Sequence, residues 1–94
     1  MRRSDALVAW DDEDDPGGNL RHVAEHGLSA DEVESVLLAD DAVEGTSRSS
    51  GRPLAAGFTF TGRWIVVVYE VAAADPAVLR PVTAYEPDPE DHAP

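Results

Sequence analysis

The pattern of hydrophobic and polar positions divides the chain into a helical first half and a β-rich second half. A short apolar run within 5–10 predicts a strand, and the next apolar residues follow the i, i+3, i+4 spacing of one helix face: Leu20, Val23 and Ala24. Asn19 is the expected N-cap of this helix. Gly27 is the expected stop, because glycine takes the left-handed conformation that ends a helix without a steric cost.

A second helix is expected directly after this stop. Ser29 and Glu32 have the spacing of a capping box, in which each side chain bonds to the backbone N–H of the other residue. Leu28 and Val33 flank the same helix start and are expected to pack on one another. The acidic pair at 40–41 is expected to end the helix.

Beyond residue 41 the apolar period changes from 3.6 to 2, which is typical of strands. Four strands are expected, at 42–46, 54–60, 63–71 and 79–86. Thr61-Gly62 predicts a tight hairpin turn, the segment 72–77 a loop, and Pro81 an edge or bulge position in the last strand. The run "WIVVVY" at 64–69 is apolar on both faces, which predicts a central strand packed on both sides.

The element order β-α-α-β-β-β-β predicts an α+β fold. We expect a small antiparallel sheet of about four to five strands, with the two short N-terminal helices packed on one face. Residues 5–86 form a single expected domain, because 94 residues support one small core. The ends at 1–4 and 87–94 are expected to be flexible polar or acidic tails.

Composition narrows the range of environments and chemistries. The chain has no cysteine, which excludes disulfides and thiolate catalysis. The apolar run at 6–10 is too short for a signal peptide, and no segment approaches the ~18 apolar residues of a membrane-spanning helix. We therefore expect a cytoplasmic protein without membrane contact.

The charge is distributed unevenly. The net charge of −12 argues against non-specific nucleic-acid binding, since phosphate contacts supply most of that affinity. The segment 45–69, however, contains no acidic residue and three arginines: Arg48, Arg52 and Arg63. This pattern predicts one locally basic surface on an otherwise acidic protein, with chance and turn composition as the alternative explanation.

One stretch matches a metal-binding motif. His22, Glu25 and His26 spell H-x-x-E-H, the motif of a zinc peptidase class. A zinc site needs a third protein ligand, and the remaining histidine, His92, lies in the predicted tail. The acidic run at 11–15 lacks the ligand spacing of a calcium-binding loop. No metal and no cofactor are therefore expected.

The basic segment carries the best candidate chemistry. Arg48 and Arg52 flank a Ser/Gly loop and are the candidate phosphate-binding residues. Metal-independent RNA cleavage needs arginine to neutralise the pentacovalent phosphate and His, Glu or Tyr to move protons. The candidate catalytic residues are Arg63, Tyr85, Glu70 and His22. Each also has an ordinary structural alternative, such as a turn-flanking arginine or a sheet-packing tyrosine.

A series of short motifs runs through roughly residues 7–86. The motifs are Trp10-Asp11, Asn19, "EHGLSADEVESVL" at 25–37, "TGRWIVVVYE" at 61–70 and "LRPVTAYE" at 79–86. This series resembles BrnT-like toxins, which belong to the RelE-type ribonuclease superfamily. The resemblance implies a RelE-like fold and a metal-independent endoribonuclease that acts on mRNA, with the ribosome as a further contact. It also implies an antitoxin-like protein partner.

The chain differs from these toxins in charge. The toxins are basic, with a lysine where this chain has Glu25 and a basic C-terminal helix where it has "EPDPEDHAP". Two hypotheses follow: a weakened toxin-type ribonuclease, or a catalytically silent relative whose acidic surface binds a basic protein. Convergence of the candidate arginines with Glu70 and Tyr85 on one concave patch would favour the ribonuclease.

Overall fold

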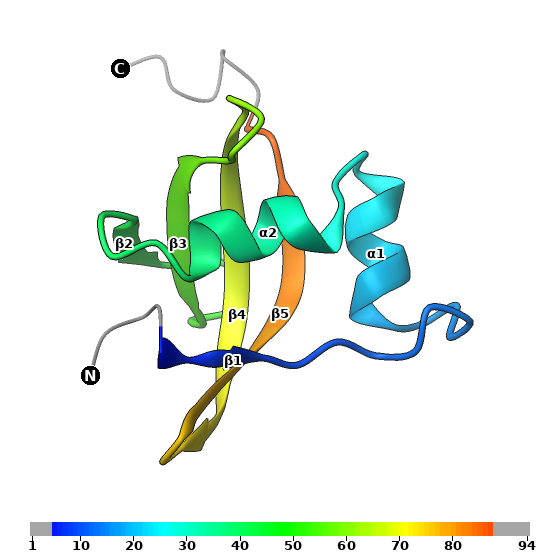
Figure 1. Ribbon diagram of the computed structural model, residues 1–94, viewed down its shortest axis with the longest axis horizontal. Helices are drawn as coiled ribbons and strands as arrows, with labels where there is room; N and C mark the ends of the chain where they lie inside the picture. The colour runs from blue at the N-terminus through cyan, green and yellow to red at the C-terminus, as the bar shows by residue number, and fades with distance from the viewer. Residues whose placement is uncertain (1–4, 88–94) are drawn as a thin grey trace.

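The computed structural model describes residues 5–87; apart from Pro87, the tails predicted at 1–4 and 87–94 lie outside them. Within this range the helices and strands follow the predicted order (Figure 1). They are β1 (Leu7–Val8), α1 (Asn19–Glu25), α2 (Ala30–Leu37), β2 (Val43–Thr46), β3 (Pro53–Phe58), β4 (Trp64–Ala74) and β5 (Ala77–Tyr85).

The strands form one open five-stranded sheet in the order β1-β5-β4-β3-β2. β1 runs parallel to β5, with Leu7 opposite Val78 and Val8 opposite Leu79, and the other neighbouring strands are antiparallel. Both helices lie on one side of this sheet (Figure 1). The predicted α+β fold is therefore confirmed.

Among the differences from the predicted strand bounds, two change the reading of a segment: the end of β3 and the segment 72–77. β3 ends at Phe58 because Thr59 already closes the turn, its N–H donating to the carbonyl of Arg63. The segment 72–77, predicted as a loop, instead continues β4 and begins β5, with Ala74 opposite Ala77. Small alanine side chains let the two backbones pair almost to the tip of the hairpin, which projects beyond the helices in Figure 1.

Pro81 lies beside a bulge, as predicted. Val68 is opposite Thr83 while Tyr69 is opposite Pro81, so Val82 is the extra residue in β5. The carbonyl of Pro81 accepts a hydrogen bond from Asn19 and therefore points away from β4. Because the N and O atoms of a strand residue point to the same side, the missing N–H of Pro81 costs no bond to β4.

The core between helices and sheet is built mainly from aliphatic side chains. Its largest fully buried members are Leu37, Ile65, Val23, Val33, Val36, Val67 and Pro81. Tyr69 is the aromatic residue of this core, at 6% exposure. Both phenylalanines stay outside it, since Phe58 is 68% and Phe60 69% exposed.

The two helices begin in different ways. α2 has the predicted capping box: the N–H of Glu32 donates to Ser29 Oγ at 3.1 Å, and the N–H of Ser29 donates to Glu32 Oε1 at 3.3 Å. The predicted stop between the helices is also present, with Gly27 at a φ of 77°. The predicted capping role of Asn19 is wrong: Gly18 is the N-cap of α1, without any side-chain cap.

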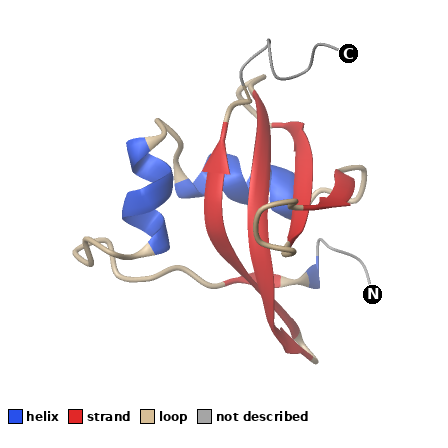
Figure 2. Ribbon diagram, turned by 180° about the vertical axis from the view of Figure 1, so that it is seen from behind, coloured by secondary structure: helices blue, strands red, loops and turns tan. Residues whose placement is uncertain are grey.

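The side of the sheet opposite the helices carries no second layer within residues 5–87, as Figure 2 shows. Residues paired directly across the strands share this side, which we call the open face. Its rows are Phe58 with Trp64, then Val43, Ala56, Val66 and Tyr85, then Gly45, Leu54, Val68 and Thr83. The loop at 47–52 passes in front of the sheet in Figure 2, and its last residue, Arg52, reaches Glu70 on β4.

Candidate functional site

The guanidinium group of Arg63 is hydrogen-bonded to several protein acceptors, although its side chain is 31% exposed. The residue follows the β3–β4 turn, on the helix side of the sheet. Its Nη1 donates to the carbonyl of Gly27 at 2.8 Å and to Glu32 Oε2 at 3.3 Å, and its Nε donates to Glu86 Oε1 at 3.0 Å. Its Nη2 also bonds Glu86. All three guanidinium nitrogens are thus already engaged by acceptors of the protein.

Glu32 is the buried anion of this group, at 8% exposure. Its Oε2 accepts a hydrogen bond from Thr61 Oγ1 at 2.8 Å. This bond is the largest cause of a lowered pKa at Glu32, with further lowering by the Ser29 N–H and by Arg63, while burial opposes it. The Arg63 cluster, made of Gly27, Glu32, Thr61, Arg63 and Glu86, therefore joins the two helices to the β3–β4 turn and the end of β5. The bond to Glu86 is likewise the main cause of a raised pKa at Arg63.

Protonation of Glu32 is expected to weaken the fold. Because the folded-state pKa of Glu32 lies below its usual 4.5, its stabilising contribution is present above about pH 4.5 and is lost as the pH falls through the folded-state pKa. Glu32→Gln should therefore lose about 1 kcal/mol at neutral pH and show a flatter acid dependence. Urea unfolding between neutral and acid pH measures both effects. The exposed Glu25→Gln is the matched control, and an unchanged acid dependence in Glu32→Gln would contradict this role.

A second polar cluster joins β1, α1 and β5. The N–H of Asp11 donates to Asn19 Oδ1 at 2.8 Å, and the N–H of Asn19 donates to Asp11 Oδ2 at 2.9 Å. Asn19 Nδ2 donates to the carbonyls of Ala9 at 3.1 Å and Pro81 at 2.8 Å. We call this arrangement the Asp11–Asn19 brace. It fastens the first turn of α1 to the last strand.

The brace continues into ion pairs on β4 and β5. Arg80 donates to Asp11 Oδ2 at 2.8 Å and to Glu70 Oε1 at 3.4 Å. Arg52 Nε lies 3.8 Å from Glu70 Oε2. Glu70 is therefore shared between two guanidinium groups. The sequence interpretation did not single out Arg80, because its two carboxylate partners lie in distant parts of the chain.

The predicted site residues do not form one patch. Arg52 and Glu70 are brought together, but Arg63 precedes β4 by one residue and so lies about 20 Å from Glu70 along the strand. Tyr85 is opposite Val66 and lies on the open face, whereas Arg63 contacts Gly27 and Glu32 on the helix side. The concave patch that would favour a ribonuclease is thus not assembled.

The remaining candidates lie on exposed surfaces. Arg48 is exposed in the loop at 47–52. His22 lies on α1 and His26 is the C-cap directly after it, with ring centroids 5.3 Å apart in an edge-to-face arrangement. Within residues 5–87, no three His, Cys, Asp or Glu side chains are grouped so that they could hold a metal ion.

An aromatic surface on the open face is the feature that sequence reasoning missed. Phe58 and Trp64 pair across β3 and β4 with ring centroids 5.0 Å apart, and Tyr85 lies on the same face at 37% exposure. The run at 64–69 was expected to pack on both sides: its helix side lies in the core, and on the open face Val68 is buried at 7% exposure while Trp64 and Val66 are half-buried. The sequence signal for this surface was the apolar character of both faces of that strand. Such a pattern predicts that each face is covered, but it does not say which element or which protein covers it.

Comparison with known proteins leaves the description at the level of the fold. No helix among residues 5–87 is long and apolar enough to cross a membrane. No protein family, no curated protein and no solved structure matches this chain.

Proposed function

We propose that this chain is a protein-interaction module and that a partner protein covers the open face of its sheet. The observation that carries this proposal is the composition of the central strand β4. Its open-face residues Trp64 and Val66 are as apolar as its buried ones and are only half-buried, and no helix or second sheet of the described chain lies over them. Contiguous apolar patches of this kind mark interaction sites on protein surfaces.

The aromatic surface has the character of an interface centre. Phe58 is 68% exposed and stacks edge-to-face on Trp64, with Tyr85 and Val43 nearby on the same face. Aromatic side chains are enriched at protein interfaces because they bury a large apolar area at little entropic cost. A small pocket of about 150 Å³ beside Phe58 and Trp64 offers space for one apolar side chain of the partner.

The charges support a partner that is basic. Asp41 lines the small pocket, so a carboxylate borders the aromatic surface. The net charge of −12 would speed association with a cationic protein and repel nucleic acid. The engagement of Arg63, Arg52 and Arg80 by carboxylates supports the same proposal, because these guanidinium groups serve the fold rather than a phosphate.

Photo-crosslinking tests this proposal. A photoreactive phenylalanine analogue at position 58 is expected to give one discrete adduct with a partner protein in cells, since this side chain would lie at the interface centre. Trp64→Ala should lower the adduct yield at least about fivefold, as expected for loss of an interface anchor. The matched control is the same analogue at Val71, which is 58% exposed on the same strand but far from the aromatic surface. Equal adduct yields at positions 58 and 71 would refute the proposal.

A second proposal is the ribonuclease activity implied by the resemblance to BrnT-like toxins. It is supported by the element order and by the residues of the shared motifs, whose hydrogen bonds join the N-terminal segment, the two helices and the last strand to one another. Trp10 Nε1 donates to Glu34 on α2 at 2.9 Å, Asp11 and Asn19 form the brace, and Ser29 caps α2. It is the weaker proposal because Arg63 and Tyr85 lie on opposite sides of the sheet.

Induced expression with mapping of new mRNA 5′ ends separates the two proposals. The interaction module is expected to leave growth and mRNA intact. Growth arrest with new 5′ ends that Tyr85→Phe abolishes would instead establish the ribonuclease. A folding check is needed for any Arg63 variant, because Arg63 holds the structural cluster described above.

A further inference from the structure

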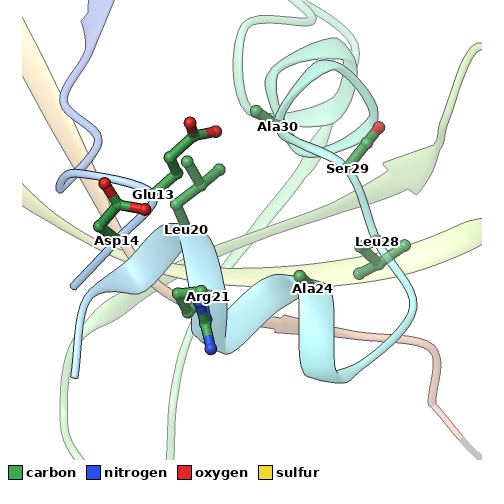
Figure 3. Close-up of a pocket in the computed structure, with 8 residues that line it drawn as sticks. All are labelled: Glu13, Asp14, Leu20, Arg21, Ala24, Leu28, Ser29 and Ala30. Atoms are coloured by element: carbon green, nitrogen blue, oxygen red, sulfur yellow. The ribbon is translucent and has the colours of Figure 1, made fainter. Parts of the chain in front are cut away.

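A shallow depression of about 430 Å³ lies on the helix side of the molecule, away from the aromatic surface. It is bordered by α1, by the turn into α2 and by the acidic loop at 11–15 (Figure 3). The residues that line it are Glu13, Asp14, Leu20, Arg21, Ala24, Leu28, Ser29 and Ala30. None of them belongs to the Asp11–Asn19 brace, and only Ser29 takes part in the capping of α2.

The floor of the depression is apolar because α1 uses only part of its hydrophobic stripe for the core. Val23 is fully buried, but Leu20 is half-buried and Ala24 is exposed, although the sequence spacing places all three on one stripe. Leu28 forms the base of the depression and is 3% exposed. Small side chains at Ala24 and Ala30 leave the space between the helices unfilled.

The rim is negatively charged on one side. Figure 3 shows the side chain of Glu13 beside Leu20, with Asp14 next to it and Arg21 directed away from both. Within residues 5–87, neither carboxylate takes part in an ion pair. The neighbouring Asp12 and Asp15 instead accept backbone N–H groups of their own loop, from Asp14 at 3.1 Å and Gly17 at 3.0 Å. The carboxylates of Glu13 and Asp14 are exposed to solvent and make no ion pair with residues 5–87.

An apolar floor beside two carboxylates that form no ion pair with the described part of the chain fits one class of side chain well. Arginine and lysine lay their aliphatic stems on apolar surface while the charged head reaches a carboxylate. A neighbouring aliphatic side chain of the same segment would fill the space over Ala24 and Leu28. Nucleic acid is disfavoured, since its phosphates would meet Glu13 and Asp14.

We propose that this depression docks a cationic segment of a partner protein. An aliphatic side chain of the segment lies on Leu20, Ala24 and Leu28, and an adjacent arginine or lysine binds Glu13 and Asp14. The inference rests on the proposed protein-binding function but uses side chains that the aromatic surface does not contain. The molecule therefore has two contact areas, one on each side of the sheet.

A labelled peptide of Leu-Arg repeats is the probe, with binding measured by fluorescence anisotropy. Glu13→Gln with Asp14→Asn is expected to weaken binding about tenfold, the effect of losing two partly exposed charge-assisted contacts. The matched control, Asp40→Asn with Asp75→Asn, removes the same charge from two other exposed carboxylates and should change binding less than about twofold. A peptide of Gly-Arg repeats should bind more weakly than the Leu-Arg probe, because it lacks the aliphatic anchor.

A second variant tests the floor without changing any charge. Ala24 is exposed, so Ala24→Trp should fold normally while filling the depression and lowering probe affinity at least about tenfold. Unchanged affinity in Ala24→Trp, or equal weakening by the two double variants, would overturn the inference. Self-association that Ala24→Trp abolishes would overturn it as well, since the occupant would then be a second copy of the chain.

The outcomes also separate this inference from the proposed function. A separate Asp41→Asn variant that alone weakens binding would place the peptide beside the aromatic surface, where Asp41 lies. The docking site would then be refuted while the protein-interaction module would stand. If the crosslinking experiment at Phe58 fails while the peptide results are as expected, the docking site stands. The proposal that a partner protein covers the open face is then refuted.

Discussion

Replacing Asn19 by alanine is expected to destabilise the fold by about 3 kcal/mol. The side chain accepts from the N–H of Asp11 and donates to the carbonyls of Ala9 and Pro81, and the residue is only 4% exposed. Alanine would remove all three bonds and leave buried backbone groups without a partner, which costs more than the loss of an exposed hydrogen bond. A domain of this size has roughly 5–14 kcal/mol of total stability, so the variant should lose between about a fifth and three fifths of it.

Urea unfolding followed by circular dichroism measures the loss at Asn19. His22→Ala is the matched control, because His22 lies on the same helix but is exposed, and its removal should change stability by less than about 0.5 kcal/mol. A loss below about 1 kcal/mol for Asn19→Ala would mean that water replaces the bonds of the brace. The interpretation of Asn19 as the residue that ties α1 to β5 would then be wrong.

Replacing Gly18 by alanine is the second large expected effect, with a loss of about 2 kcal/mol. A Cβ at this position would lie 2.8 Å from the Cβ of Asp11 and 3.2 Å from both the Cβ and the carbonyl oxygen of Asp15. These atoms belong to the backbone or lie next to it, so they cannot move aside as the end of a long side chain can. The brace brings Asp11 against the N-cap of α1, and only glycine leaves the space for it.

The neighbouring Gly17 is the control for Gly18. A Cβ on Gly17 would meet only Asp15 Oδ1, at an ordinary contact distance of 3.7 Å. Gly17→Ala should therefore be neutral or slightly stabilising, because alanine restricts the unfolded chain. Thermal or urea unfolding of the two variants side by side distinguishes close approach from a general intolerance of this loop. Equal losses at both positions would contradict the steric explanation.

Local sequence rules predicted the elements that depend on near neighbours. The capping box of Ser29 and Glu32, the stop at Gly27 and the bulge beside Pro81 each arise from residues a few positions apart. The rule failed at Asn19, which looks like an N-cap from its place before the helix stripe. Its partner, the carbonyl of Pro81, lies 62 positions away, and no local pattern contains that contact.

The candidate site illustrates a different limit. The segment 45–69 has no acid in sequence, which predicted a basic surface. In space, carboxylates from other segments reach its arginines: Glu32 and Glu86 bind Arg63, and Glu70 binds Arg52. Charge along the chain therefore predicts charge on the surface only where the fold brings in no counter-ions. Arg48 is exposed in the loop at 47–52, and it remains consistent with the predicted basic surface.

The pairing of the first strand with the last has a consequence for the timing of synthesis. β5 lies between β1 and β4, so the sheet has a gap until translation reaches its final strand. Arg80 and Pro81, which bind Asp11 and Asn19, are made 69 and 62 residues after their partners. During synthesis α1 therefore lacks its anchor until β5 has been made, and the complete sheet can form only after that point.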